Sequence, residues 1–243
     1  MGRLDWQLGT VRSTVPVTPR THLLTIELPG WEGHLPGQHV DVRLTAEDGY
    51  QAQRSYSIAS ASHPSTIELA VERLDDGEVS AYLTDVVIPG DQLELRGPIG
   101  GYFTWTVADG GPVLLVAGGS GVAPLMSMIR QRFLEGSDLP MRLLYSSRAW
   151  DEIIYHDELT ELSARNDGFE LVQTLTRRQP PGWTGYSRRI DRDMLESVAY
   201  PADSAPLAYV CGPTALVESA AGLLVELGYD PLTVKTERFG PTG

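Results

Sequence analysis

One glycine-rich segment in the second half of the chain has the residue types needed to bind a phosphate group. Gly118-Gly119-Ser120-Gly121 follows the apolar run 112–117 and precedes a helical pattern that holds Pro124 in its first turn. Glycines at a strand-to-helix junction allow positive φ angles and let a pyrophosphate approach bare backbone, while the helix N-terminus adds partial positive charge. The segment does not match the GxGxxG fingerprint, so a tight turn without a ligand is the competing interpretation.

Cys211-Gly212-Pro213 repeats this arrangement one strand–helix unit later. Ligands of open α/β sheets collect at the carboxyl ends of the strands, so we expect both segments to line one crevice. Cys211 is the single cysteine of the chain. Its position at a strand end favours a ligand-facing thiol, and the alternative is a buried structural thiol, the more common state of a lone cysteine.

The first half holds a second kind of candidate site, Arg54-Ser55-Tyr56-Ser57. An arginine suits a diphosphate, an aromatic ring suits stacking on a planar heterocycle, and a hydroxyl suits a ring nitrogen. Strand alternation would place Arg54 and Tyr56 on one side and the two serines on the other, unless a bulge intervenes. Gly77-Glu78-Val79-Ser80 is a further possible anion-binding helix start. The alternatives are an ordinary exposed strand and a simple helix N-cap.

The elements that must position these segments differ between the two halves of the chain. Before about residue 108, short runs with partly alternating apolar residues and turn residues between them indicate an antiparallel barrel or sandwich with one short helix. Afterwards, buried-type strands alternate with helices, as in a doubly wound parallel sheet. We therefore expect two domains, residues 1–108 and 109–243. The expected strands are 38–44, 54–60, 66–74, 112–117, 141–146, 169–175 and 206–211, and the expected helices are 78–85, 122–134, 156–165 and 214–227.

Composition narrows the classes of function. The chain has 243 residues and a formal net charge of −13, which argues against nucleic acid or an anionic membrane surface as main partner. A single cysteine excludes a disulfide framework, a structural zinc cluster and a cysteine-ligated iron–sulfur centre within this chain, and we expect no metal site. The longest apolar runs have five residues and the N-terminus lacks a secretory signal pattern, so we expect a cytoplasmic protein without membrane insertion.

Together these segments resemble the ferredoxin–NADP⁺ reductase-like family of flavoproteins, and the resemblance covers almost the whole chain. It implies an N-terminal antiparallel six-stranded FAD-binding β-barrel followed by a doubly wound parallel-sheet NAD(P)-binding domain. The matching segments are Arg54 to Ser57 for the family's RxYS flavin motif, Gly77 to Ser80 for its second FAD motif, and Gly118 to Pro124 and Cys211 to Pro213 for the pyridine nucleotide, with further similarity at Ser147 to Leu159 and Glu237 to Gly240.

The resemblance also implies a role for each side chain at the flavin. Arg54 would pair with the FAD diphosphate, Tyr56 would pack on the isoalloxazine ring, and Ser57 would lie near its N5 atom. Cys211 would lie beside the nicotinamide and Glu237 near the flavin edge, which makes Ser57, Cys211 and Glu237 the expected catalytic residues. Ser57 and Cys211 are expected to position the reacting groups rather than to act as acids or bases.

Plant-type ferredoxin reductases end on an aromatic residue that covers the flavin. Here Phe239 is the expected cover, although it is followed by Gly240-Pro241-Thr242-Gly243, so a C-terminal extension or a different cover stays open. The full set of expected cofactor-binding residues is Arg54, Ser55, Tyr56, Ser57, Val71, Gly77, Val79, Ser80, Gly118, Gly119, Ser120, Gly121, Pro124, Ser147, Arg148, Arg177, Cys211, Gly212, Pro213 and Phe239.

The choice between NADPH and NADH depends on positive charge near the adenosine ribose. Ser147-Arg148 matches a Ser-Arg pair that often holds the extra phosphate of NADPH in this family. Arg177-Arg178 and Arg188-Arg189 add cations to a chain that has few, and the alternative is that they pair with surplus carboxylates. No acidic residue stands where an NADH-selective site would put one to bind the 2′-hydroxyl, although Asp151 is close. We expect NADPH to be preferred, with NADH as the other possible reductant.

The electron acceptor must lie outside this chain, since two domains fill it and one cysteine cannot hold a two-iron cluster. We expect an FAD-dependent NAD(P)H oxidoreductase that serves a separate protein such as a ferredoxin, cytochrome or metallo-oxidoreductase. A strongly acidic reductase suits a partner with a basic docking face. The alternatives are reduction of free flavin, quinone or ferric complexes, a non-catalytic FAD-binding subunit, and a nucleotide-binding module without flavin. The sequence does not determine the oligomeric state.

Overall fold

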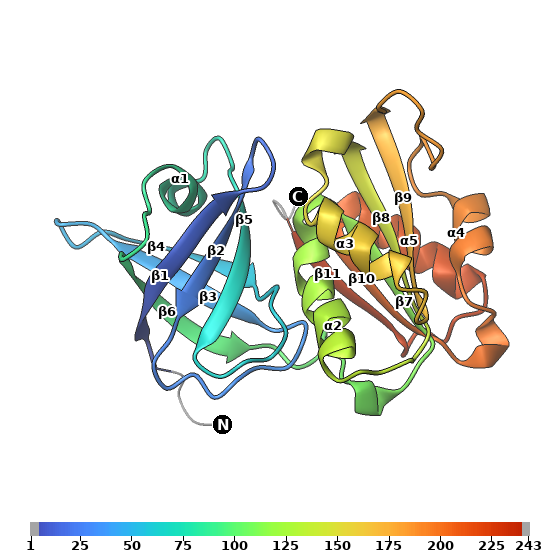
Figure 1. Ribbon diagram of the computed structural model, residues 1–243, viewed down its shortest axis with the longest axis horizontal. Helices are drawn as coiled ribbons and strands as arrows, with labels where there is room; N and C mark the ends of the chain where they lie inside the picture. The colour runs from blue at the N-terminus through green and yellow to red at the C-terminus, as the bar shows by residue number, and fades with distance from the viewer. Residues whose placement is uncertain (1–4, 240–243) are drawn as a thin grey trace.

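The computed structural model describes residues 5–239, which form two sheets lying side by side (Figure 1). The expectations about a secretory signal and about a C-terminal extension concern residues 1–4 and 240–243, outside the described residues. The first sheet is antiparallel, in the order β4-β3-β6-β1-β2-β5. Its strands are β1 (Gln7–Pro16), β2 (Thr21–Glu27), β3 (His39–Thr45), β4 (Gln51–Ser57), β5 (Thr66–Glu72) and β6 (Gln92–Ile99).

The two edges of this sheet meet, which confirms the expected six-stranded barrel. An antiparallel bridge between Ile58, just after β4, and Leu69 of β5 joins them. The interior is apolar because alternate strand residues point inward, as where Leu24 of β2 lies opposite Leu69, both with no exposed surface. Helix α1 (Glu78–Asp85) lies at one end of the barrel, over the range expected from the sequence (Figure 1).

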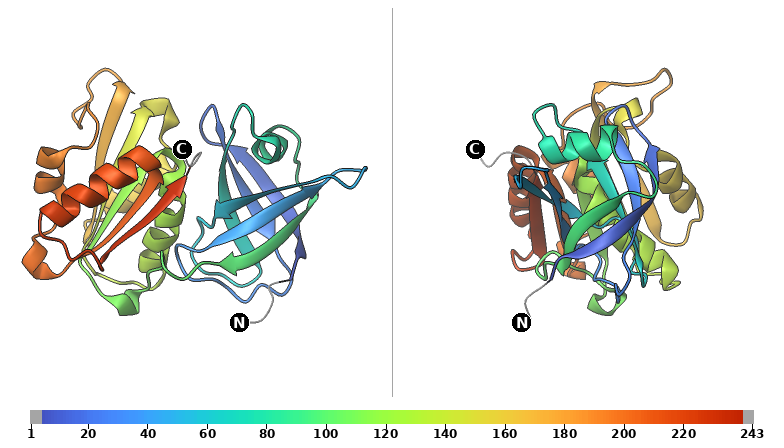
Figure 2. Two further views of the ribbon diagram at one scale, coloured as in Figure 1. Left: turned by 180° about the vertical axis from the view of Figure 1, so that it is seen from behind. Right: turned by 90° about the vertical axis from the view of Figure 1, so that its left-hand side faces the viewer.

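The second sheet is parallel throughout, in the order β11-β10-β7-β8-β9. Helices α2 and α3 cover one face and α4 and α5 the other, as the two opposite views of Figures 1 and 2 show, so the expected doubly wound sheet is confirmed. Its elements are β7 (Val113–Gly118), α2 (Val122–Leu134), β8 (Met141–Ala149), α3 (His156–Ala164), β9 (Phe169–Arg178), α4 (Arg192–Val198), β10 (Leu207–Pro213), α5 (Thr214–Glu226) and β11 (Val234–Phe239). Among residues 5–239, no helix has both the length and the apolar character needed to cross a membrane.

A partly buried ion-pair network ties the barrel to the second sheet. The Arg130 guanidinium of α2 donates to a Glu68 oxygen of β5 at 2.7 Å and to Glu158 of α3 at 2.6 and 2.7 Å. The Tyr155 hydroxyl donates to the same Glu68 oxygen at 2.9 Å. Burial and the neighbouring Glu68 carboxylate raise the pKa of Tyr155 well above its ordinary value, so this hydroxyl keeps its proton. The network fixes the position of the barrel relative to the parallel sheet.

Candidate functional site

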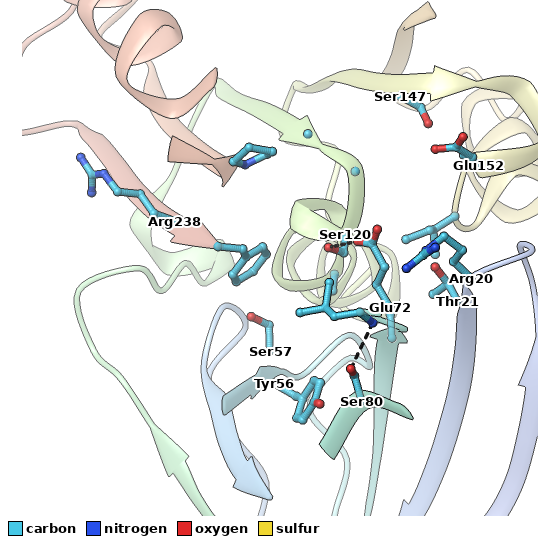
Figure 3. Close-up of a pocket in the computed structure, with 18 of the residues that line it drawn as sticks. Arg20, Thr21, Tyr56, Ser57, Glu72, Ser80, Ser120, Ser147, Glu152 and Arg238 are labelled. Atoms are coloured by element: carbon cyan, nitrogen blue, oxygen red, sulfur yellow. Dashed lines mark hydrogen bonds between the residues drawn. The ribbon is translucent and has the colours of Figure 1, made fainter. Parts of the chain in front are cut away.

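A cavity of about 1070 Å³ lies between the barrel and the carboxyl ends of β7, β8, β10 and β11 (Figure 3). This volume is at the upper end of the range for small-molecule sites and suits a dinucleotide better than a small metabolite. Fifteen of the residues expected from the sequence line this cavity. They are Arg54, Ser55, Tyr56, Ser57, Gly77, Val79, Ser80, Gly118, Gly119, Ser120, Ser147, Arg148, Pro213, Glu237 and Phe239.

Strand β4 supplies the wall that carries Arg54 and Tyr56. Its pairing with β3 is regular from His39 opposite Ser57 to Thr45 opposite Gln51, so no bulge interrupts the alternation. Within residues 5–239, the Arg54 guanidinium makes no ion pair with a carboxylate, and its side chain donates only to the Gln53 carbonyl at 2.6 Å. Burial raises the pKa of Tyr56 to about 12. This wall therefore offers an available cation and a neutral aromatic ring, as a diphosphate and a planar heterocycle require.

Ser55 borders the cavity but its hydroxyl is already engaged. It donates to Asp41 at 2.6 Å, and the same carboxylate accepts from Arg96 at 2.6 Å. Although burial alone would raise it, the pKa of Asp41 lies below its ordinary value because of the Ser55 and Arg96 hydrogen bonds. The Ser55 side chain thus stabilises the β3–β4–β6 region of the barrel.

The turn before α1 is tightly built around Gly77 and Ser80. Gly77 is the N-cap residue of α1, and a Cβ at this position would overlap the Ser80 Oγ atom. That oxygen accepts from the Leu74 amide at 3.1 Å (Figure 3). It also donates to the Gly77 carbonyl at 3.2 Å. Since the Ser80 hydroxyl is used within the turn, the amides at the start of α1 are the groups left to meet an anion.

The glycine-rich segment closes β7 and forms a short 3₁₀ turn, η2 (Gly119–Gly121), before α2. Gly119 has φ +55° with open space beside it, as expected for a glycine next to a ligand. Gly118 and Gly121 serve packing instead, since a Cβ at Gly118 would lie 2.7 Å from Leu216 and one at Gly121 would overlap the Cys211 carbonyl oxygen. Pro124 is buried in the first turn of α2. Gly121 and Pro124 therefore shape the turn without lining the cavity.

Cys211 and Glu237 lie side by side on the neighbouring strands β10 and β11. Cys211 has no exposed surface and does not line the cavity, so its thiol is of the buried kind. Its Sγ lies 3.9 Å from Glu237 Oε2. Burial, helped by the Glu237 carboxylate, raises the pKa of Cys211 well above its ordinary value. Burial also raises the pKa of Glu237 to about 7, so this cavity-lining carboxyl exchanges a proton near neutral pH.

Three further expected residues do not line the cavity, because their side chains point to the other face of a strand or because the residue packs against another strand. Val71 of β5 has no exposed surface and points into the barrel core, whereas its neighbours Ala70 and Glu72 line the cavity. Arg177 of β9 is exposed away from the cavity that Thr176 lines. Gly212 packs against the backbone of Gly118, where a Cβ would lie 3.0 Å from the Gly118 nitrogen.

Sequence reasoning missed several residues that line the same cavity, among them Arg20, His39, Glu72, Glu152 and Arg238. Arg20 reaches it from the β1–β2 turn, where its guanidinium donates to the Arg73 carbonyl at 2.7 Å and pairs with Asp75 at 3.0 Å. His39 lies opposite Ser57 in the β3–β4 ladder. Glu72 and Arg238 each stand next to residues expected at the site, namely Val71 for Glu72 and Glu237 and Phe239 for Arg238.

The arginines considered for the adenosine phosphate are mostly paired with carboxylates. Arg148 Nε donates to Glu152 at 2.8 Å and Arg178 pairs with Asp151 at 2.6 Å. Arg188 pairs with Asp191. All three arginines are thus paired with carboxylates, as the alternative interpretation proposed. Of the three, only Arg148 lines the cavity.

Two family models match this chain. The oxidoreductase FAD-binding domain matches residues 9–104, and the oxidoreductase NAD-binding domain matches residues 115–222. Ferredoxin–NADP reductase B of Sorangium cellulosum is 34% identical over 234 residues, which cover 92% of this chain and 93% of that protein. The chain belongs to the ferredoxin–NADP reductase family.

Other members of this family are similar over different shares of their length. The glycine betaine monooxygenase reductase subunit of Pseudomonas aeruginosa is 35% identical over 210 residues, which cover 85% of this chain and 56% of that protein. The chain thus spans little more than half the length of such relatives. Among solved structures, a ferredoxin NADP⁺ reductase of Neisseria gonorrhoeae with bound FAD and NADP superposes with a TM-score of 0.80 at 22% identity, covering 96% and 98% of the two chains. An Amycolatopsis cytochrome P450 reductase has a TM-score of 0.86 at 25% identity, covering 100% and 72%.

Proposed function

We propose that this ferredoxin–NADP reductase family member is an FAD-dependent NAD(P)H oxidoreductase that delivers electrons to a separate redox protein. The observation that carries the proposal is the single cavity into which the barrel places Arg54, Tyr56 and Ser57 and the parallel sheet places its glycine turn. FAD supplies the hydride and single-electron chemistry when bound, so the protein's task is to bind, orient and exclude water.

On the barrel side, Arg54 pairs with the FAD diphosphate, Tyr56 packs against the ring system and Ser57 orients it. The residues fit this group because the Arg54 guanidinium has no ion pair among residues 5–239 and Tyr56 stays protonated with its pKa near 12. Val79 and Ser80 line the same cavity in the first turn of α1, where backbone amides without intrahelical partners would add donors for the diphosphate.

On the sheet side, the Gly118–Ser120 turn receives the pyrophosphate of the pyridine nucleotide, and Pro213 and Phe239 border the nicotinamide end. Glu237 holds or releases a proton at the cavity wall, since its pKa is about 7. Cys211, buried behind the wall, acts as a positioning residue that supports Glu237 rather than as a group that touches the nucleotide. We also propose that the boundary between the two domains lies after residue 108, in the connection between β6 and β7. The proposed location of the protein is the cytoplasm.

NADPH is the proposed reductant over NADH. Ser147 and Arg148 line the cavity at the carboxyl end of β8, next to the strand that carries the glycine turn. An arginine in this place of a dinucleotide fold accommodates the adenosine 2′-phosphate. Equal steady-state kcat/KM values for NADPH and NADH would contradict this preference.

The proposed acceptor is a metal-containing redox protein of the kind served by oxygenase reductases. Relatives of the chain are named as the reductase subunit of a glycine betaine monooxygenase in Pseudomonas aeruginosa and as the electron transfer component of a 2-halobenzoate 1,2-dioxygenase in Burkholderia cepacia. The net charge of −13 favours a partner with a basic docking face.

The acceptor is tested by measuring NADPH-driven reduction of purified ferredoxins, cytochromes and oxygenase components in parallel with free flavin, a quinone and ferric citrate. Faster transfer to one protein than to all small acceptors, with a rate that falls as salt screens the docking charges, supports the proposal. Equal or faster transfer to the small acceptors at every salt concentration would replace it with a reductase of diffusible acceptors.

A further inference from the structure

Arg148, the cation proposed to meet the 2′-phosphate of NADPH, is held between two carboxylates in the same cavity. Its Nε donates to Glu152 Oε2 at 2.8 Å, and its Nη2 lies 3.9 Å from Glu72 Oε1. The other Glu72 oxygen accepts a hydrogen bond of 2.7 Å from Ser120 in the glycine turn. All four residues line the cavity, and Figure 3 shows the Glu72, Ser120 and Glu152 side chains around it.

The Arg148 guanidinium therefore faces two carboxylates, while Arg20, which also lines the cavity, is paired with Asp75 at 3.0 Å. A 2′-phosphate that pairs with Arg148 has to compete with Glu152 for the Nε edge and is repelled by both carboxylates. The 2′-hydroxyl of NADH carries no charge and is not repelled by these carboxylates. In dinucleotide folds an acidic residue near this position accepts a hydrogen bond from that hydroxyl.

Neighbouring cations cannot substitute for Arg148. Arg177 is exposed away from the cavity, and Arg178 is bound by Asp151 at 2.6 Å. Among the described residues of β8 and β9, Arg148 is thus the cation that lines the cavity. Whatever controls the Arg148 guanidinium controls the discrimination between the two nucleotides.

We propose that Glu152 is a specificity-determining residue that limits the preference for NADPH by holding Arg148. Glu152 follows β8 in the short turn η3 (Trp150–Glu152), four residues after Arg148, so the contact is fixed by local backbone. The inference rests on the proposed function, since it assumes that the cavity binds NAD(P)H. The further claim is that the protein keeps substantial activity with NADH, because the Glu152 carboxylate is paired with the Arg148 guanidinium that would bind the 2′-phosphate.

The test compares 2′,5′-ADP with 5′-ADP, binding to the FAD-loaded protein by isothermal titration calorimetry. In Glu152→Gln the affinity for 2′,5′-ADP should rise about tenfold, the scale of one unit-charge interaction near a protein surface, while that for 5′-ADP changes by less than about twofold. The ratio of kcat/KM for NADPH to that for NADH should rise by a similar factor.

A matched control is Glu196→Gln. Glu196 pairs with Arg192 at 3.7 Å in the same i,i+4 order and does not line the cavity, so both affinities should stay unchanged. In the double variant Arg148→Ala, Glu152→Gln the gain for 2′,5′-ADP should vanish, because it acts through the guanidinium.

Three results would overturn the inference. They are an unchanged ratio of the two affinities in Glu152→Gln, an equal rise for both ADP forms, and a gain that persists without Arg148. If the wild-type protein binds neither ADP form, the proposed function falls together with the inference. If it binds both but the ratio does not respond, the inference alone falls.

Discussion

At the scale of single residues, the pairing of Glu237 with Cys211 makes one wall of the cavity sensitive to pH. Burial raises the pKa of Glu237 from an ordinary 4.5 to about 7, and raises that of Cys211 beyond the physiological range. Near neutral pH, Glu237 therefore changes its charge and Cys211 does not. The acid–base behaviour of this wall depends on the carboxyl group.

This assignment predicts how stability depends on pH. Between pH 4.5 and about 7 the folded chain keeps the Glu237 proton that the unfolded chain releases, so this group lowers stability as pH rises through that window. Glu237→Gln removes the effect and should stabilise the protein at pH 8 by about 3 kcal/mol, with no gain at pH 4. Urea unfolding at both pH values measures it, and a gain of equal size at both would contradict the assignment.

Arg54 is the residue on which flavin retention should depend most. Arg54→Ala removes a charge-assisted contact to the diphosphate, so FAD affinity should fall by about 10- to 100-fold. Arg12→Ala is the matched control, because Arg12 is also an exposed barrel arginine but pairs with Glu27 away from the cavity. The flavin-to-protein ratio after purification measures the effect, and full occupancy in Arg54→Ala would show that Arg54 has another role.

At the scale of elements, the junction of β7, η2 and α2 depends on backbone packing as much as on phosphate binding. Gly121→Ala would drive a methyl group into the Cys211 carbonyl of β10, so it should lower the free energy of unfolding by about 2–3 kcal/mol. Gly222→Ala is the control, because no atom lies within 4 Å of its Cβ position in α5. That change should stabilise the helix by about 0.5–1 kcal/mol. Equal effects of the two substitutions in chemical denaturation would contradict this packing.

Local patterns in the sequence located several elements well. The helices at 78–85 and 122–134 agree with α1 and α2, since capping, periodicity and turn residues act within a few positions. The sequence did not locate β1, β2, β6, α4 or β11. Strand β11 carries Lys235, Glu237 and Arg238 and lies at a sheet edge, so only its pairing with β10 makes it a strand. The strand pattern left a barrel or a sandwich open, and the six-stranded barrel came from the family resemblance, because closure of a barrel is a long-range pairing.

The sequence predicted which segments form the site, but not which residues of a strand face the cavity. Motif positions identified most of the lining, yet Val71 and Arg177 point away because a one-residue shift in a strand reverses the side chain. Glu72 was missed because its contact with Ser120 joins the barrel to the parallel-sheet domain and leaves no local signature. Glu152 lies four residues after Arg148, so this i,i+4 pair was visible in the sequence, but that the pair lines the cavity was not.

At the scale of the whole molecule, the Arg130 network should hold the two walls of the cavity in register. Arg130→Ala leaves the Glu68 and Glu158 carboxylates without their cation, so the free energy of unfolding should fall by about 2–3 kcal/mol. Arg165→Ala, which removes an exposed pair with Glu161, should cost less than about 0.5 kcal/mol. Differential scanning calorimetry of the two variants measures both effects, and similar losses would mean that the network contributes little.

The whole molecule also carries the central claim, that one cavity aligns a flavin with a pyridine nucleotide. An anaerobic titration that follows the visible spectrum of the FAD-loaded protein as NADPH is added tests it most directly. Bleaching of the oxidised flavin spectrum by stoichiometric NADPH is the expected result. An oxidised spectrum that persists with both NADPH and NADH, or the absence of a protein-bound flavin spectrum after FAD has been supplied, would contradict the account.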